Sequence, residues 1–273
     1  MRQRWTFILL MVVCLLVLAA PSISRAQTRS APDNVNSDLP ALIYAGDSWG
    51  FFAFPQMRQH LIDAGYADNY SIINRAVPGS HASQWASGYF LRSVLRQLRP
   101  SPGNPIVIFS LGGNDFLYGD VRYSGGGLDD PIYGLIEQRL RSIVDQILAE
   151  RGDTTILFVG YDILNMDKTP ECHDMAVDLA GSGLPQDVNP LLVELGELQR
   201  RVADDYSQVY YADVIGALQG HPGAADMNAW SPLPYFIGYI GWQQDCIHMG
   251  QEGYGVFTGS ILDRMQRLGL LSP

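Results

Sequence analysis

The chain has 273 residues, of which 47% are apolar and 17% charged. This balance is typical of a globular protein with a sizeable core and excludes a disordered or fibrous chain. The formal net charge of −10 disfavours nucleic acid and other polyanions as partners over a broad surface, although a local basic pocket escapes this argument.

Residues 1–26 have the pattern of a secretory signal peptide. Two arginines precede the 14-residue apolar run "FILLMVVCLLVLAA", and the small residues Ser24 and Ala26 follow it. A permanent membrane anchor is the alternative, but such a segment usually needs about 20 apolar residues. We therefore expect cleavage after Ala26, no remaining membrane anchor, and a secreted or periplasmic protein. Cleavage removes three of the 18 basic residues and no acid, which leaves 15 against 28 and a formal charge of −13.

After this segment, residues 27–40 are polar and contain Pro, Asn and Asp, as in a flexible leader. Residues 41–273 then form one predicted domain, in which short apolar runs alternate with stretches of helical periodicity. The runs predict strands at 41–46, 70–76, 105–111, 154–160 and 208–214. The periodic stretches predict helices at 131–150, 191–206 and 254–270. Strands that alternate with helices indicate an α/β fold, in which right-handed crossovers build a parallel sheet covered on both faces.

Two connections, 161–189 and 215–247, are too long to be ordinary loops of a compact domain, so we expect them to be functional or to carry small helices. Each contains one of the two cysteines that remain after export. Two cysteines in an oxidising compartment predict a disulfide between Cys172 and Cys246. A zinc site of Cys172, His173 and Cys246 is the alternative, but its spacing matches no common zinc pattern.

The residues "GDSWG" at 46–50 come directly after the first predicted strand, where ligands gather in α/β sheets. Ser48 is therefore either a nucleophile or a helix N-cap, while Asp47 is expected to brace the turn. Near the C-terminus, "DCIHMGQEGY" places Asp245 three residues before His248, so one segment supplies both a base and the carboxylate that orients it. Gly-x-Ser-x-Gly is also the nucleophile elbow of α/β-hydrolases, but that elbow follows several strands, so we interpret this match as accidental.

Four separated blocks in the right order resemble the SGNH, or GDSL-type, hydrolase family. They are "GDSW" at 46–49, "NRAVPG" at 74–79, "GGND" at 112–115 and "DCIH" at 245–248. The resemblance spans residues 41–270 and implies a three-layer α/β/α, flavodoxin-like fold whose five-stranded parallel sheet has the order 2-1-3-4-5. Trp49 departs from the pattern, because many members have Leu there.

The resemblance also implies a role for each matched residue. Ser48 would attack the acyl carbonyl, His248 would accept and return its proton, and Asp245 would orient His248. The oxyanion would be bound by the backbone N–H groups of Ser48 and Gly79 and by the side-chain amide of Asn114. The alternatives are that Gly79 only makes a turn and that Asn114 only caps a helix or turn. No metal and no cofactor is implied, and no nucleotide-binding motif is present in the sequence.

The segment 229–242 is rich in aromatic residues and leads directly to Asp245. Together with Trp49, its residues Tyr235, Phe236 and Trp242 are candidates for substrate binding, or they pack in the core. We therefore expect an exported carboxylic ester hydrolase that acts on a small-molecule or polysaccharide ester. The alternatives are a carbohydrate O-acetylesterase acting on acetylated polysaccharide and a non-catalytic glycan-binding module on the same fold.

Overall fold

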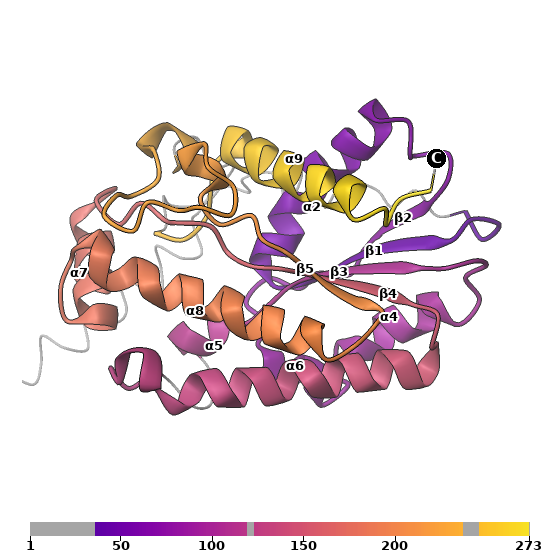
Figure 1. Ribbon diagram of the computed structural model, residues 1–273, viewed down its shortest axis with the longest axis horizontal. Coiled ribbons are helices and arrows are strands. Elements are labelled where there is room, and N and C mark those ends of the chain that lie inside the picture. Colours follow the sequence, from indigo (N-terminus) through magenta and orange to yellow (C-terminus); the bar gives the residue numbers. More distant parts are fainter. Residues whose placement is uncertain (1–35, 119–122, 237–245, 273) are drawn as a thin grey trace, which may run out of the picture.

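The structure is a computed structural model that describes residues 36–118, 123–236 and 246–272 (Figure 1). The predicted signal peptide at 1–26 and most of the predicted leader at 27–40 lie outside the described residues. Asp245 and Trp242 lie outside them as well.

A five-stranded sheet forms the centre of the molecule. Its strands are β1 (Ala41–Gly46), β2 (Ser71–Asn74), β3 (Ile106–Ser110), β4 (Thr155–Val159) and β5 (Val209–Ala212). All neighbouring pairs are parallel and the order is β2-β1-β3-β4-β5, which confirms the predicted topology. Each strand lies within a run predicted from the sequence, because an apolar run of this length is buried on both faces of a parallel sheet.

Helices cover both faces of the sheet, and Figure 1 shows the three layers from the side. On one face, α2 (Ser48–Asp63) packs against α9 (Gln251–Arg267). On the other face lie α4 (Leu91–Leu98), α6 (Pro131–Glu150) and α8 (Pro185–Asp204). The other elements of the described residues are α3 (Ala82–Ala86), α5 (Gly113–Tyr118), α7 (Pro170–Ala180) and the 3₁₀ turns η1 (Gly127–Asp129), η2 (Ala217–Gln219) and η3 (Leu233–Phe236).

Helix α6 shows how local sequence sets these elements. Asp130 accepts a hydrogen bond from the backbone N–H of Ile132 (3.0 Å), and Pro131 occupies the first helical position, where no N–H is needed. Apolar residues then recur every three or four positions and are fully buried, among them Ile136, Leu140, Ile143, Val144 and Ile147. Burial stabilises the fold by roughly 1.5–3 kcal/mol for each large aliphatic side chain.

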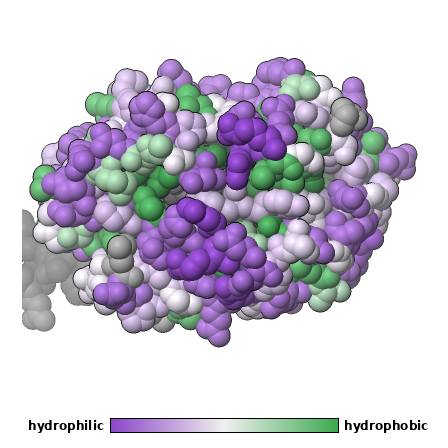
Figure 2. Space-filling view, in the orientation of Figure 1, coloured by the Kyte–Doolittle hydropathy of each residue, from purple (hydrophilic) through white to green (hydrophobic). Residues whose placement is uncertain are grey.

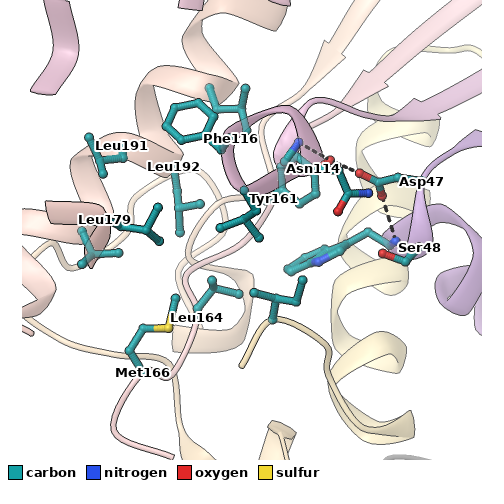
Figure 3. A pocket seen from close by; sticks show the side chains of 16 residues that line it. Asp47, Ser48, Asn114, Phe116, Tyr161, Leu164, Met166, Leu179, Leu191 and Leu192 are labelled. Atoms are coloured by element: carbon teal, nitrogen blue, oxygen red, sulfur yellow. Dashed lines mark hydrogen bonds between the residues drawn. The ribbon is translucent and has the colours of Figure 1, made fainter. Parts of the chain in front are cut away.

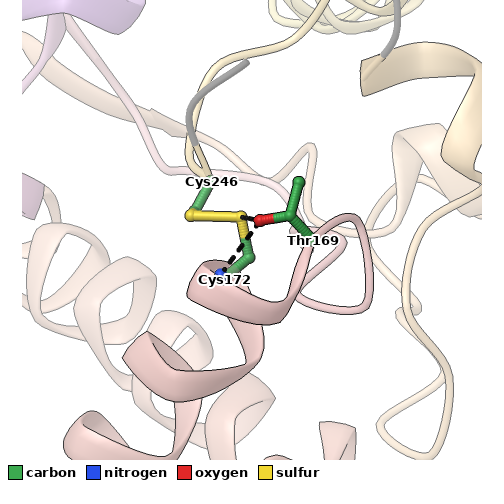
Figure 4. Close-up of a disulfide and its surroundings, with 3 residues drawn as sticks. All are labelled: Thr169, Cys172 and Cys246. Carbon is green, nitrogen blue, oxygen red and sulfur yellow. Dashed lines mark hydrogen bonds between the residues drawn. A yellow bond between two sulfur atoms is a disulfide. The ribbon is translucent and has the colours of Figure 1, made fainter. Parts of the chain in front are cut away.

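The two long connections are joined to each other at several points. The buried carboxylate of Asp162 accepts hydrogen bonds from the backbone N–H groups of Gly216 (2.5 Å) and Leu218 (2.8 Å). Burial nevertheless raises the pKa of Asp162 to about 6. A disulfide between Cys172, in α7, and Cys246 confirms the predicted pairing (Figure 4).

The surface is mostly hydrophilic on the face shown in Figure 2, where hydrophobic residues form small separate patches. Apolar side chains gather instead around the sheet, in one continuous core. In the described parts of the chain, none of the helices combines the length and the hydrophobicity that a membrane-spanning segment needs.

Candidate active site

The site begins at the carboxyl ends of β1 and β3, where Gly46 pairs with Ser110. Gly46 has a φ of +116°, and a Cβ built on it would lie 1.9 Å from the carbonyl oxygen of Ser110. Any side chain here would therefore force the two strands apart. The next residue, Asp47, donates its backbone N–H to the same Ser110 oxygen (2.9 Å) before the chain turns into α2. This turn places Ser48 at the carboxyl edge of the sheet.

Asp47 is the N-cap of α2. Its side chain accepts a hydrogen bond from the backbone N–H of Trp49 (2.9 Å), and Ser48 is the first helical residue. The capping role that the sequence leaves open for Ser48 thus belongs to Asp47. N–H groups in the first turn of a helix have no partner within the helix, so the Ser48 backbone can donate to a substrate.

Ser80 connects the loop after β2 to the end of β1. Its hydroxyl donates to the carbonyl oxygen of Gly46 (3.2 Å) and accepts from the indole N–H of Trp85 (2.9 Å). Its own carbonyl accepts from the side-chain amide of Asn114 (3.0 Å). Gly79 comes just before Ser80 and has a φ of +74°, a conformation that disfavours any residue with a side chain. The structure therefore brings Gly79, from the loop after β2, and Asn114, from the start of α5, to the same edge of the sheet as Ser48.

Asn114 lies in α5, just after β3, and is buried at 5% exposure. An amide nitrogen carries two hydrogens, and the bond to Ser80 uses one of them. Its neighbour Asp115 supports the backbone instead. The Asp115 carboxylate accepts from the N–H of Ala82, at the start of α3 (2.8 Å), and pairs with Arg139 (2.9 Å). Burial raises the pKa of Asp115, and the charge of Arg139 opposes that rise.

Tyr161, which belongs to none of the four sequence blocks, connects the ends of three strands. It follows β4, donates its hydroxyl proton to the carboxylate of Asp47 and accepts from the backbone N–H of Gly113 (2.8 Å). Asp47 is buried at 1% exposure, and this burial raises its pKa to about 7 even though Tyr161 and the Trp49 N–H stabilise its charge. Burial, followed by the negative charge of Asp47, raises the pKa of Tyr161 as well. The only sequence signal for Tyr161 is its position after a predicted strand.

His248 lies in the segment that leads into α9. Met249 beside it is fully buried, and the N–H of Gly250, the N-cap of α9, donates to the carbonyl of Tyr235 (2.7 Å). The His248 ring meets the ring of Phe52 edge-on, with centroids 5.1 Å apart. Phe52 follows Ser48 by four residues on α2, and residues so spaced share one face of a helix. The structure thus brings His248 to the helical turn that begins with Ser48.

An apolar cavity opens beside Ser48 (Figure 3). Figure 3 shows Ser48, Asp47 and Asn114 at one end and Leu179, Leu191 and Leu192 at the other. The cavity contains about 660 Å³ not filled by protein atoms, counting the part open to solvent. Its walls come from α2, α5, the two long connections and α8, and most of them are aliphatic: Leu117, Leu164, Met166, Leu179, Val188, Leu191, Leu192, Leu195 and Ile247.

The sequence model of the GDSL-like lipase/acylhydrolase family matches residues 42–256. The chain belongs to this family. No curated protein sequence matches the chain. The resemblance to GDSL-type hydrolases noted in the sequence is thereby confirmed, and family membership implies ester hydrolysis as the class of activity.

Solved structures show the same fold as this GDSL-like family member. A protein from Parabacteroides merdae described as a GDSL-like lipase matches with a TM-score of 0.55 at 14% identity, over 86% of this chain and 99% of that chain. The lipase/acylhydrolase from Enterococcus faecalis matches with a TM-score of 0.53 at 14% identity, over 86% and 98%. The acetyl xylan esterase AlAXEase matches with a TM-score of 0.52 at 14% identity, over 83% and 99%. At these identities the matches establish the fold alone.

The aromatic residues predicted to bind substrate are divided between the site and the core of this GDSL-like domain. Trp49 is buried, lines the cavity, and packs edge-on against Tyr161 and Phe257, with centroids 5.1 and 5.3 Å away. Phe236 is fully buried in the hydrophobic core and Tyr235 is partly buried against it; neither lines the cavity.

Within the described residues, no group of three or more His, Cys, Asp or Glu side chains is arranged to hold a metal ion. The zinc alternative of the sequence analysis is wrong, because Cys172 and Cys246 are joined to each other and neither sulfur is a free thiolate. Its third member, His173, lies on the surface 3.8 Å from Asp167.

Proposed function

We propose that this family member hydrolyses carboxylic esters through an acyl-enzyme on Ser48, with His248 as the base and Asp245 as its orienting carboxylate. One observation carries the proposal. Ser48 begins helix α2 beside the apolar cavity, at the sheet edge where the Gly79 loop and Asn114 of α5 meet. His248 packs against Phe52, which lies one turn further along the same helix. A nucleophile, a base and amide donors around one small volume are the parts that acyl transfer requires.

In the first half of the reaction, the Ser48 hydroxyl oxygen attacks the ester carbonyl while its proton passes to His248. The carbonyl oxygen becomes an oxyanion, which accepts hydrogen bonds from the backbone N–H groups of Ser48 and Gly79 and from the second amide hydrogen of Asn114. The bond to the alcohol oxygen then breaks, and His248 returns the proton to the departing alcohol. Water, deprotonated by His248, attacks the acyl-enzyme and releases the acid and free Ser48.

The cavity favours an acyl chain longer than acetyl. Each methylene group transferred from water to an apolar wall contributes about 0.8 kcal/mol. An acetyl group has no methylene that could reach Leu179, Leu191 or Leu192 at the far end of the cavity. We therefore place the esters of medium-length acyl chains ahead of acetylated polysaccharide as substrates. The predicted signal peptide and the disulfide support export to a secreted or periplasmic location.

Chain-length profiling tests the proposal. The p-nitrophenyl esters of acetate, butanoate and octanoate should be hydrolysed with kcat/KM rising along the series, and acetate release from acetylated xylan should be slower. Ser48→Ala should abolish hydrolysis, while Ser207→Ala, a change of the same kind at an exposed position far from the cavity, should not. Acetate as the best acyl group would favour the acetylesterase. A wild-type protein that binds glycan without hydrolysing any ester would favour the binding module.

A further inference from the structure

A second concave surface lies outside the site described above. We call it the arginine groove, and it is lined by the loop after β2 and by α4 with the turn before it. Its lining residues are Arg75, Ala76, Val77, Tyr89, Phe90, Arg92, Ser93, Leu95, Arg96 and Arg99. Four of these ten residues are arginines, although the chain as a whole has a net charge of −10.

Three of the four arginines form a stripe. Arg92, Arg96 and Arg99 are separated by four and three residues, so they share one face of α4 and its C-cap, and all three are exposed. Like charges at this spacing repel each other and destabilise a helix. The stability of α4 therefore gives no reason for the stripe, and a ligand of opposite charge would give one.

Arginines elsewhere in the described residues mostly have carboxylate partners. Ion pairs join Arg139 to Asp115, Arg141 to Glu137, Arg151 to Asp153, Arg200 to Glu197, Arg201 to Glu194 and Arg267 to Asp263. In the groove, Arg99 pairs with Glu150 (2.5 Å). By contrast, Arg92 and Arg96 form no ion pair with any residue that the structure describes. Two neighbouring cations without acidic partners give the groove a local positive potential.

The sheet order relates the groove to the site. The apolar cavity is built from residues that follow β1, β3 and β4, whereas the groove lies at β2, on the opposite side of β1. Val77 lines the groove only two residues before Gly79, and its N–H donates to the carbonyl of Gly46 at the end of β1 (2.8 Å). Val77 thus connects the groove to the end of β1, two residues before Ser48, which lines the apolar cavity.

We propose that the arginine groove binds a phosphate group on the alcohol part of the ester, so that the substrate has an apolar acyl chain and a phosphate-bearing alcohol. This inference rests on the proposed function. A guanidinium group presents paired N–H donors that match phosphate oxygens. A phosphate monoester has three such oxygens and a charge between −1.5 and −2 at about pH 7, which suits two or three guanidinium groups, whereas one is enough for a carboxylate. Tyr89, which is 66% exposed, and Phe90 lie beside these donors and provide apolar contact for the carbon skeleton of the alcohol.

Binding is tested first, in full-length protein carrying Ser48→Ala so that no turnover occurs. Calorimetry with glycerol 3-phosphate should show saturable binding that glycerol does not show. Arg92→Gln with Arg96→Gln should weaken it at least tenfold. The control, Arg200→Gln with Arg201→Gln, removes the same charge from α8 and should leave binding unchanged. Equal binding of glycerate, a carboxylate of similar size, or full binding by the Arg92 and Arg96 double variant would overturn the proposal.

Turnover is tested second, in protein with an intact Ser48. The KM for 1-octanoylglycerol 3-phosphate should be at least tenfold lower than the KM for 1-octanoylglycerol. The ratio of these two KM values should approach one in the Arg92 and Arg96 double variant. It should be unchanged in the Arg200 and Arg201 control. If both esters are hydrolysed with equal KM, the groove proposal fails and the esterase stands. If neither ester is hydrolysed while glycerol 3-phosphate still binds through Arg92 and Arg96, the proposed function fails and the phosphate site stands.

Discussion

The imidazole of His248 packs edge-on against the ring of Phe52, with their centroids 5.1 Å apart. Phe52 lies one helical turn after Ser48, so this contact brings His248 to the same part of α2 as Ser48, although Ser48 and His248 are 200 positions apart in the sequence. Aromatic contacts of this geometry are favourable and directional. We therefore expect Phe52 to orient the proposed base relative to the proposed nucleophile.

Replacing Phe52 tests this role. Phe52→Ala removes the wall beside the imidazole, so His248 should visit unproductive orientations and kcat should fall by roughly tenfold or more, with a smaller change in KM. Phe52→Leu keeps an apolar wall and should recover part of the loss. Steady-state kinetics with p-nitrophenyl butanoate would measure both variants, with thermal melts to establish that they fold. A folded Phe52→Ala variant with normal kcat would show that Phe52 does not position His248.

Asn114 is expected to act in the transition state more than in substrate binding. Removal of one oxyanion donor costs about 3 kcal/mol in comparable enzymes, so Asn114→Ala should lower kcat by roughly a hundredfold with little change in KM. The same substitution also removes the hydrogen bond to the Ser80 carbonyl, so its melting temperature must be recorded alongside. A raised KM with unchanged kcat would instead make Asn114 a contact for the bound ester.

The far end of the apolar cavity should control acyl-chain length. Leu192→Trp places a larger side chain there, so the ratio of kcat/KM for the octanoate ester to that for the acetate ester should fall about tenfold, as expected when two methylene groups lose their apolar contacts. Val177→Trp is the matched control, because Val177 is 40% exposed on nearby α7 and does not line the cavity. An unchanged ratio in Leu192→Trp would place the acyl chain elsewhere.

The disulfide should stabilise both the fold and the segment that carries His248. It closes a loop with a sequence separation of 74, for which chain entropy predicts about 4 kcal/mol. Cys172→Ser with Cys246→Ser should therefore lower the melting temperature by several degrees. Activity should fall at temperatures where the variant is still folded, because Cys246 lies two residues before His248. Full activity of the folded double variant would show that the disulfide acts on stability alone.

The buried carboxyl of Asp47 makes stability depend on pH. Its pKa is raised from an ordinary value of 3.8 to about 7, so between these values the folded protein holds this proton more tightly than the unfolded chain does. The contribution of Asp47 to the free energy of unfolding is thus complete below about pH 4 and is lost as the pH rises towards 7. The hydrogen bond from Tyr161 and the proximity of His248 oppose this rise in the pKa of Asp47, and the negative charge of Asp115 adds to it.

Asp47→Asn isolates this effect, because asparagine also caps helices but does not titrate. Urea unfolding at pH 4.5 and pH 7.5 should show wild type losing stability relative to Asp47→Asn at the higher pH. A stability difference that is constant between the two values, or that changes in the opposite direction, would mean that Asp47 is already ionised in the folded protein at low pH.

Much of the fold is predictable because its signals are local. Each strand is a short apolar run, and α6 has a cap, a first-position proline and a regular apolar pattern within 20 residues. Helix α8 is harder, since the prediction begins it at 191, after Pro190, whereas it begins at Pro185. A proline lacks one N–H and does not end a helix whose buried positions, from Val188 through Leu191 to Leu195, continue on both sides of it.

The site is predictable only in part, for a similar reason. Ser48, Gly79, Asn114 and His248 belong to short sequence blocks, so each can be found without a structure. The bond from Tyr161 to Asp47 and the contact between Phe52 and His248 join distant segments, and nothing local marks them. The stripe of Arg92, Arg96 and Arg99 is visible as a helical spacing, but its position across from Arg75 depends on how α4 packs against β1 and faces the loop after β2.

Covalent labelling tests the central claim, that Ser48 is the nucleophile, most directly. An alkyl fluorophosphonate loses fluoride when an activated serine oxygen attacks its phosphorus, so it marks the nucleophile itself. Peptide mass spectrometry should find one adduct, on Ser48, that forms at the rate at which esterase activity is lost and is absent from Ser48→Ala. An adduct on a different residue, or full loss of activity with Ser48 unmodified, would contradict the account.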